Sequence, residues 1–98
     1  MICKSYNLFF ETIGNKTRLK ILELLFNRNM SVGEICKALN EEQSKISHNL
    51  KKLAECHFLD VKKIGKKRIY SLNKKTIIPL LKLVERHVKC YCGVCKRK

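Results

Sequence analysis

The sequence has few acidic residues, no long hydrophobic run and none of the patterns of a targeting segment. Eight Asp and Glu stand against 22 Lys and Arg, which leaves a formal net charge of +14 on 98 residues. The longest uncharged apolar stretch, residues 76–81, is interrupted by Pro79 and is far too short to cross a bilayer. The N-terminus does not have the basic and apolar regions of a signal peptide. We therefore expect a cytoplasmic protein that does not associate with membranes.

Catalytic patterns are missing as well. The sequence shows no paired-carboxylate, Ser/His/Asp or phosphate-loop pattern, and its three histidines, His48, His57 and His87, are dispersed along segments with helical periodicity. No internal repeat, low-complexity tract or linker divides the chain. A chain of this length forms one domain with a modest core. We expect no enzymatic activity.

The positive charge is concentrated in two parts of the chain. Residues 58–75 carry seven basic side chains and one acidic one, and residues 82–98 carry six and one. A field of this sign attracts polyanions and speeds their capture. Ribosomal, membrane-surface and DNA-binding proteins all share this property. The positive charge alone therefore does not distinguish these classes of protein, and the order of the secondary-structure elements is needed as well.

Periodicity and capping residues predict four helices in the first part of the chain. The first covers Tyr6–Ile13, and Asn15 caps the second. Ser31, with Glu three residues later, forms a capping-box pattern that begins a third helix. Asn40, with Gln three residues later, repeats the pattern and predicts a fourth helix that runs to about Cys56. Two caps this close together predict two helices joined by a tight turn, which is a helix-turn-helix.

A β-hairpin and a fifth helix are expected after the helix-turn-helix. Two β-prone runs, 58–64 and 68–72, flank a Gly-containing turn. The last helix is expected over Thr76–Lys89, with Pro79 in its first turn. The expected fold is mostly α with a β-hairpin wing, in the order helix-helix-helix-helix-strand-strand-helix. This is a winged helix-turn-helix.

Such a fold is suited to reading duplex DNA, because its second paired helix fits the major groove and a basic hairpin can lie along the backbone. On the fourth helix, Ile46, Leu50 and Leu53 form an apolar stripe. The candidates for contacts at or near the bases lie off this stripe: Ser44, Lys45, Ser47 and His48. The candidates for phosphate contacts are Lys51, Lys62, Lys66, Lys67 and Arg68. The alternatives are a Lys-rich turn that is only a solvated hairpin tip and a His48 that is only a surface histidine.

Three stretches resemble a known family, the ArsR/SmtB winged-helix repressors. Residues 14–22 (GNKTRLKIL) resemble the start of that family's second helix, and residues 43–53 (QSKISHNLKKL) resemble its recognition helix. Residues 65–72 (GKKRIYSL) are similar to its wing. The motifs occur in the same order, and the resemblance covers roughly residues 6–89.

The resemblance implies a homodimer built from the first and last helices. It would place two recognition helices one DNA turn apart on an inverted-repeat operator. The residues favour a dimer independently, because the apolar faces of 6–13 and 77–88 have no obvious partner in so small a domain.

Many members of the family release DNA when a metal binds, but two of their usual sites are only partly matched. Cys36 stands at the first position of the arsenic-binding Cys pair, and Ala38 replaces the second, so Cys36 is expected to be a core residue. Glu85 and His87 match only part of the zinc site on the last helix. We interpret Cys56 as a packing residue as well.

The C-terminal end, residues 90–98, is a basic Cys-rich tail that follows a DNA-binding domain of residues 1–89. Cys90, Cys92 and Cys95 form a C-x-C-x-x-C pattern, and His87 or Cys3 could supply a fourth ligand. A reducing cytosol disfavours a structural disulfide, so we expect metal binding, with a redox switch and no sensory role as the alternatives. Three or four thiolates suit Zn(II), Cu(I) or As(III), and Cys-rich sets also hold iron–sulfur clusters.

The leading hypothesis is a homodimeric transcriptional repressor that binds double-stranded DNA and whose affinity is modulated by a thiolate-bound metal or metalloid. One alternative is a winged-helix regulator without metal sensing, whose cysteines are structural or redox-active. The other is a nonspecific architectural or RNA-binding protein that uses only the positive charge. Discrimination between specific and random duplex separates the last from the others.

Overall fold

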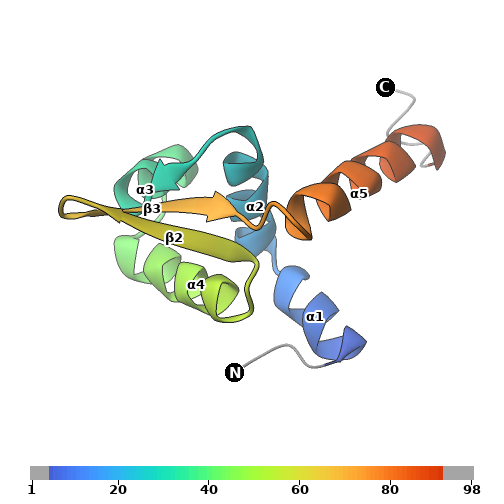
Figure 1. Cartoon of the computed structure of the whole chain (residues 1–98), viewed down its shortest axis with the longest axis horizontal. Coiled ribbons are helices and arrows are strands. Elements are labelled where there is room, and N and C mark those ends of the chain that lie inside the picture. Colours follow the sequence, from blue (N-terminus) through green and yellow to red (C-terminus); the bar gives the residue numbers. More distant parts are fainter. Residues whose placement is uncertain (1–4, 92–98) are drawn as a thin grey trace.

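The computed structural model describes residues 5–91 and confirms the expected order of elements (Figure 1). The described helices and strands are α1 (Tyr6–Ile13), α2 (Lys16–Asn27), β1 (Met30–Ser31), α3 (Val32–Leu39), α4 (Gln43–Glu55), β2 (Leu59–Ile64), β3 (Lys67–Leu72) and α5 (Ile77–Tyr91). Within this part of the chain, every helix is too short or too polar to cross a membrane.

The helix starts at α2 and α3 follow the sequence rules. The Asn15 side chain accepts a hydrogen bond from the Arg18 N–H at 3.0 Å. Ser31 and Glu34 form a complete capping box: the Ser31 hydroxyl accepts from the Glu34 N–H at 3.3 Å, and the Glu34 carboxylate accepts from the Ser31 N–H at 2.9 Å. Two of the four orphan N–H groups at the start of α3 are thereby satisfied.

The expectation that Asn40 caps α4 is wrong. Asn40 has a left-handed conformation, with φ 55° and ψ 51°, and ends α3 by donating its N–H to the carbonyls of Cys36 and Lys37. Asparagine tolerates this conformation better than most residues, so it serves as a C-cap here. The N-cap of α4 is Glu42, whose side chain makes no capping hydrogen bond within the described residues.

The hairpin is part of a three-stranded antiparallel sheet in the order β1-β3-β2. Leu59 pairs with Leu72 and Ile64 pairs with Lys67, which leaves a two-residue turn of Gly65 and Lys66. Gly65 has φ 62°, a left-handed conformation that glycine adopts without a steric penalty. The strand β1 was not expected from the sequence, because two residues are too short to show alternation.

The core lies between α2, α3, α4 and the inner face of the sheet. The expected stripe of α4 is confirmed, since Ile46, Leu50 and Leu53 are fully buried. The other large side chains that are fully buried come from α2, α3, the sheet, the residue before the sheet's β2 strand and the first residue of α5: Ile21, Leu22, Ile35, Leu72, Phe58 and Ile77. The wing projects from one side of this body, whereas α1 and α5 lie at the other end of the molecule (Figure 1).

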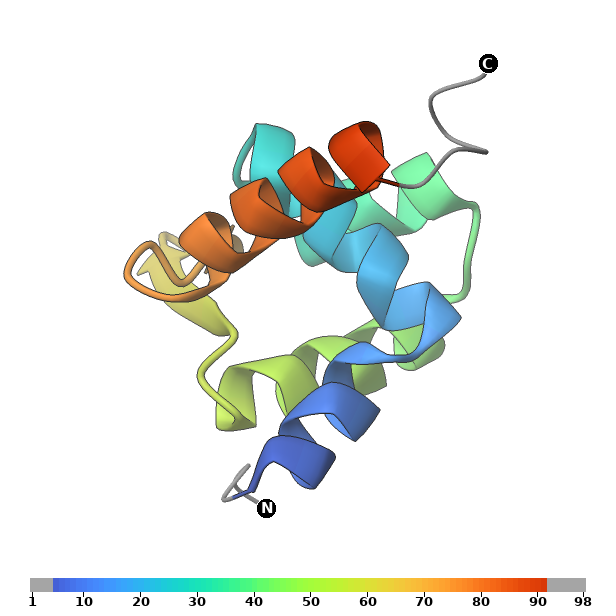
Figure 2. The same cartoon turned by 90° about the vertical axis from the view of Figure 1, so that its right-hand side faces the viewer.

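Helix α5 extends two residues beyond the expected end at Lys89. Of its residues only Ile77 is buried, while Leu83 and Val84 are exposed. Figure 2 shows α5 and α1 on either side of α2 at this end of the molecule. Large apolar surfaces of both helices therefore remain uncovered in a single chain.

Candidate nucleic-acid interface

The outward face of α4 carries the side chains that the sequence analysis selected for base contacts. Ser44, Lys45 and His48 are exposed, and Ser47 is half-buried. Because the opposite face of the helix is fixed in the core, these polar side chains point to solvent in a defined direction. A helix held in this way can enter the major groove with its polar face toward the bases.

Lys45 has a local partner on this face. Its Nζ lies 3.3 Å from Oε1 of Glu41, one helical turn earlier, and both side chains are partly exposed. Exposed pairs of this kind contribute about 0–1 kcal/mol. A DNA phosphate can therefore replace Glu41 as the partner of Lys45 at little cost.

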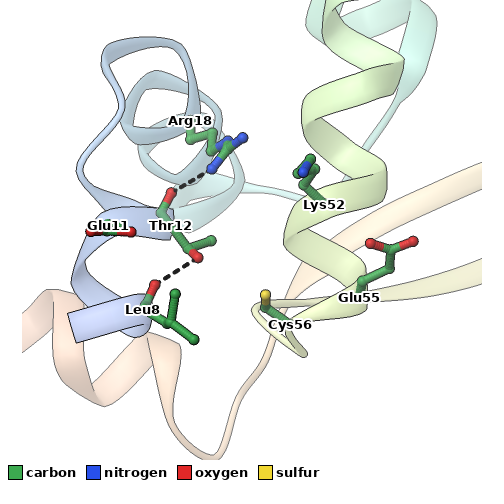
Figure 3. Close-up of a pocket in the computed structure, with 7 residues that line it drawn as sticks. All are labelled: Leu8, Glu11, Thr12, Arg18, Lys52, Glu55 and Cys56. Atoms are coloured by element: carbon green, nitrogen blue, oxygen red, sulfur yellow. Dashed lines mark hydrogen bonds between the residues drawn. The ribbon is translucent and has the colours of Figure 1, made fainter. Parts of the chain in front are cut away.

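A partly buried polar contact that the sequence analysis missed holds α4 in place. The Arg18 Nε donates to Oδ1 of Asn49 at 2.9 Å, and the Asn49 Nδ2 donates to the Lys45 carbonyl at 2.9 Å. Arg18 also donates through Nη1 to the Thr12 carbonyl of α1 at 3.1 Å (Figure 3). One guanidinium thus connects α1, α2 and α4. The signal was a single polar residue, Asn49, placed within the apolar stripe between Ile46 and Leu50.

Figure 3 shows the pocket beside this contact, lined by residues of α1, α2 and the C-terminal part of α4. Lys52 and Glu55 lie on its α4 side, across from Thr12. Lys52 is exposed on the same face of α4 as His48 and Lys45, four and seven residues earlier, whereas Lys51 lies about 100° away around the helix axis.

The wing residues chosen for phosphate contacts, Lys62, Lys66, Lys67 and Arg68, are all exposed. The register pairs Lys63 with Arg68 and Lys62 with Ile69, so Lys62 lies on the opposite face of the hairpin from Arg68. Lys63 is exposed as well, and the sequence analysis gave it no role. The hairpin is therefore basic on both faces.

The tip of the wing and the N-terminus of α4 lie on the same side of the molecule (Figure 1). Between them is an open groove, lined by the first turn of α3, Lys37, Gln43 and the wing residues Lys66, Lys67 and Arg68. This arrangement can present a helix to the major groove while basic side chains meet the adjacent backbone.

The one acidic side chain among the described residues that line this groove is Glu34. The hydrogen bond from the Ser31 backbone N–H, helped by the charge of Arg28, lowers the pKa of the Glu34 carboxyl below its ordinary value. The Arg28 Nη1 lies 3.6 Å from Oε2 of Glu34. The negative charge of this residue is therefore already engaged by its own neighbours.

The cysteine site can be located only in part. His87 and Cys90 are exposed on α5, whereas Cys3, Cys92 and Cys95 lie outside the described residues. Within residues 5–91, no three His, Cys, Asp or Glu side chains are close enough to hold a metal together. Cys36 and Cys56 are half-buried and pack against the core, as expected of packing residues.

The fold and the exposed face of α4 define a winged helix-turn-helix DNA-binding regulator, and comparison with known proteins agrees. Residues 15–61 match the family described as bacterial regulatory protein, arsR family. The regulator Rv0081 of Mycobacterium tuberculosis is 33% identical over 79 residues, which cover 80% of this chain and 69% of that protein. The repressor SdpR of Bacillus subtilis is 36% identical over 67 residues, or 68% of this chain and 74% of SdpR. The chain belongs to the arsR family.

Solved structures show the same architecture. The crystal structure of Rv0081 superposes with a TM-score of 0.79 at 30% identity, covering 91% of this chain and 88% of that one. The homodimeric winged helix-turn-helix DNA-binding domain Mb0332 of Mycobacterium bovis superposes with a TM-score of 0.73 at 24% identity, covering 81% and 77%. The winged helix-turn-helix predicted from the sequence is thereby confirmed, and the relatives by sequence are transcriptional regulators.

Proposed function

We propose that this protein is a homodimeric repressor that binds an inverted-repeat DNA operator through α4 and the wing. The observation that carries the proposal is the division of α4 into two faces. One face is buried and pinned by Arg18, and the other presents Ser44, Lys45 and His48 to solvent beside a basic hairpin. A repressor of this kind acts where the DNA lies, so we propose a cytoplasmic location.

The surfaces of α1 and α5 support the dimer. Tyr6 and Phe10 of α1 are 88% and 60% exposed, and Leu83 of α5 is 57% exposed. Apolar side chains exposed together at one end of a small domain indicate an interaction surface. A second copy that meets these helices would leave the two wings at the far ends of the assembly and both α4 helices available to one duplex.

Sequence-specific binding can be tested by in vitro selection of random duplexes with the full-length protein. We expect a selected operator that binds at least about a thousandfold more tightly than random duplex, as specific regulators do. A ratio below about tenfold would instead indicate a nonspecific architectural protein.

The role of the exposed face can be tested on the same operator. His48→Ala should lose about 0.5–1.5 kcal/mol of discrimination at one base pair if His48 makes one hydrogen bond to a base edge. The matched control is Asn27→Ala, an exposed position on α2 that should leave discrimination unchanged. Equal discrimination by the two variants would remove His48 from the interface.

We further propose that Cys90, Cys92 and Cys95 hold a soft metal or metalloid, with His87 or Cys3 as the fourth ligand. The support is the donor chemistry: His87 and Cys90 lie three residues apart on exposed α5, and the remaining thiols follow directly in the sequence. Side chains at this spacing share one helix face. Thiolate and imidazole donors suit Zn(II), Cu(I) or As(III).

Elemental analysis of the purified protein tests the metal site directly. We expect a bound metal that disappears when Cys90, Cys92 and Cys95 are all changed to Ser. Titration of the metal against the protein–operator complex then tests sensing, and equal operator affinity with and without metal would exclude it. A metal that persists in the triple variant would place the site elsewhere.

A further inference from the structure

The groove between the wing tip and α3 has a strongly positive lining that comes from two separate elements. Lys66, Lys67 and Arg68 belong to the wing, and Lys37 belongs to the last turn of α3. All four side chains are exposed. Four cations on the two sides of one groove form a binding surface for a polyanion.

The acidic residues close to this region do not cancel the charge. Glu34 lines the groove, but its two carboxylate oxygens are engaged by the Ser31 N–H and by Arg28. Glu41 and Glu42, which precede α4, are not among the residues that line the groove. The groove therefore keeps a net positive charge.

The spacing between the two sides of the groove is set by the sheet. Ser31 pairs with Ile69 of β3, the residue after Arg68, and the same Ser31 caps α3. The start of α3 is thus attached to the root of the wing. This pairing fixes α3, which carries Lys37, relative to the wing cations, and Gln43, the first residue of α4, lines the same groove.

We propose that one strand of the DNA sugar-phosphate backbone lies in this groove, contacted from one side by Lys37 and from the other by the wing. The inference deepens the proposed function and rests on it. It assigns a phosphate contact to Lys37 of α3, a residue outside both the recognition helix and the hairpin. This strand of the sugar-phosphate backbone flanks the major groove that α4 enters.

Salt dependence tests the proposal, because each phosphate contact that is lost reduces the slope of log K against log salt concentration by about 0.9. Full-length protein carrying Lys37→Gln should show this reduction on both the selected operator and random duplex, with their affinity ratio unchanged. Lys37→Arg should keep the wild-type slope. The matched control is Lys20→Gln, an exposed lysine of α2 that does not line the groove and whose loss should leave the slope unchanged.

A second measurement identifies the phosphate. Operators with a neutral methylphosphonate at one backbone position should bind the wild-type protein less tightly, and at one such position Lys37→Gln should show no further loss. The proposal is overturned if Lys37→Gln behaves as Lys20→Gln does while Lys67→Gln still lowers the slope. Failure of the proposed function has a different signature, since the selected operator and random duplex would then bind with similar affinity.

Discussion

Replacement of Asn49 by alanine should destabilise the protein far more than the loss of one small side chain suggests. Asn49 is 7% exposed and accepts a charged hydrogen bond from Arg18 Nε at 2.9 Å. Hydrogen bonds to charged groups contribute about 1.5–3 kcal/mol, and removal of the acceptor leaves a partly buried donor without this partner. The second hydrogen bond, from Nδ2 to the Lys45 carbonyl, adds little, because that carbonyl still accepts the helical N–H. We expect a loss of about 2–3 kcal/mol.

Urea unfolding followed by circular dichroism at fixed protein concentration measures this loss. Concentration must be fixed because association would shift the apparent stability. The matched control is Asn27→Ala: the Asn27 Nδ2 also donates to a carbonyl four residues earlier, at 3.3 Å, but the residue is exposed. Changes at exposed positions of this kind are usually within about 0.5 kcal/mol.

A double-mutant cycle assigns the effect to the contact. Arg18→Ala and Asn49→Ala should show a coupling energy of at least about 1 kcal/mol, because the two side chains touch directly. The reasoning is refuted if Asn49→Ala costs no more than Asn27→Ala, or if the two losses at Arg18 and Asn49 simply add. In either case the position of α4 would depend on apolar packing alone.

Three further outcomes are expected. Lys51→Gln should weaken operator binding and reduce the salt slope by about 0.9, whereas Lys20→Gln, at an exposed position of α2, should do neither; the same slope for both would remove Lys51 from the interface. Phe10→Asp places a charge on the exposed apolar face of α1 and should therefore convert the dimer to a monomer. Analytical ultracentrifugation measures this change, and a persistent dimer would place the interface elsewhere. Glu34 has a lowered pKa in the folded state, so its stabilising effect should be complete above about pH 4.5 and disappear as the pH falls through the folded pKa. The difference in urea midpoint between wild type and Glu34→Ala should accordingly be larger at pH 7 than at pH 3.

Local sequence rules predicted the helices, the hairpin and the exposed face of α4, because the capping boxes and apolar stripes depend on residues close together in the chain. The same rules could not distinguish Ser31 from Asn40. Both are followed by Glu or Gln three residues later, yet Ser31 begins a helix and Asn40 ends one in a left-handed conformation. Which of the two roles Asn40 adopts depends on how the turn between the two helices is packed, and that information is tertiary.

The residues missed by sequence reasoning are defined by distant partners. Asn49 is significant because Arg18, 31 positions earlier, reaches it. Lys37 acquires its proposed role because β1 attaches α3 to the wing, and a two-residue strand leaves no pattern in the sequence. The cysteines that we propose as metal ligands are the opposite case: their spacing is visible only in the sequence, and Cys92 and Cys95 lie outside the described residues.

The double use of Ser31 has a consequence for how a duplex is selected. Because this residue both pairs with β3 and caps α3, the hairpin cannot swing away from the helix-turn-helix without breaking hydrogen bonds in the sheet or at the helix start. A DNA-binding domain whose hairpin and helix-turn-helix are fixed relative to each other binds DNA whose groove width matches this fixed geometry. We therefore expect base pairs that no side chain touches to influence affinity through the stiffness and curvature of the double helix.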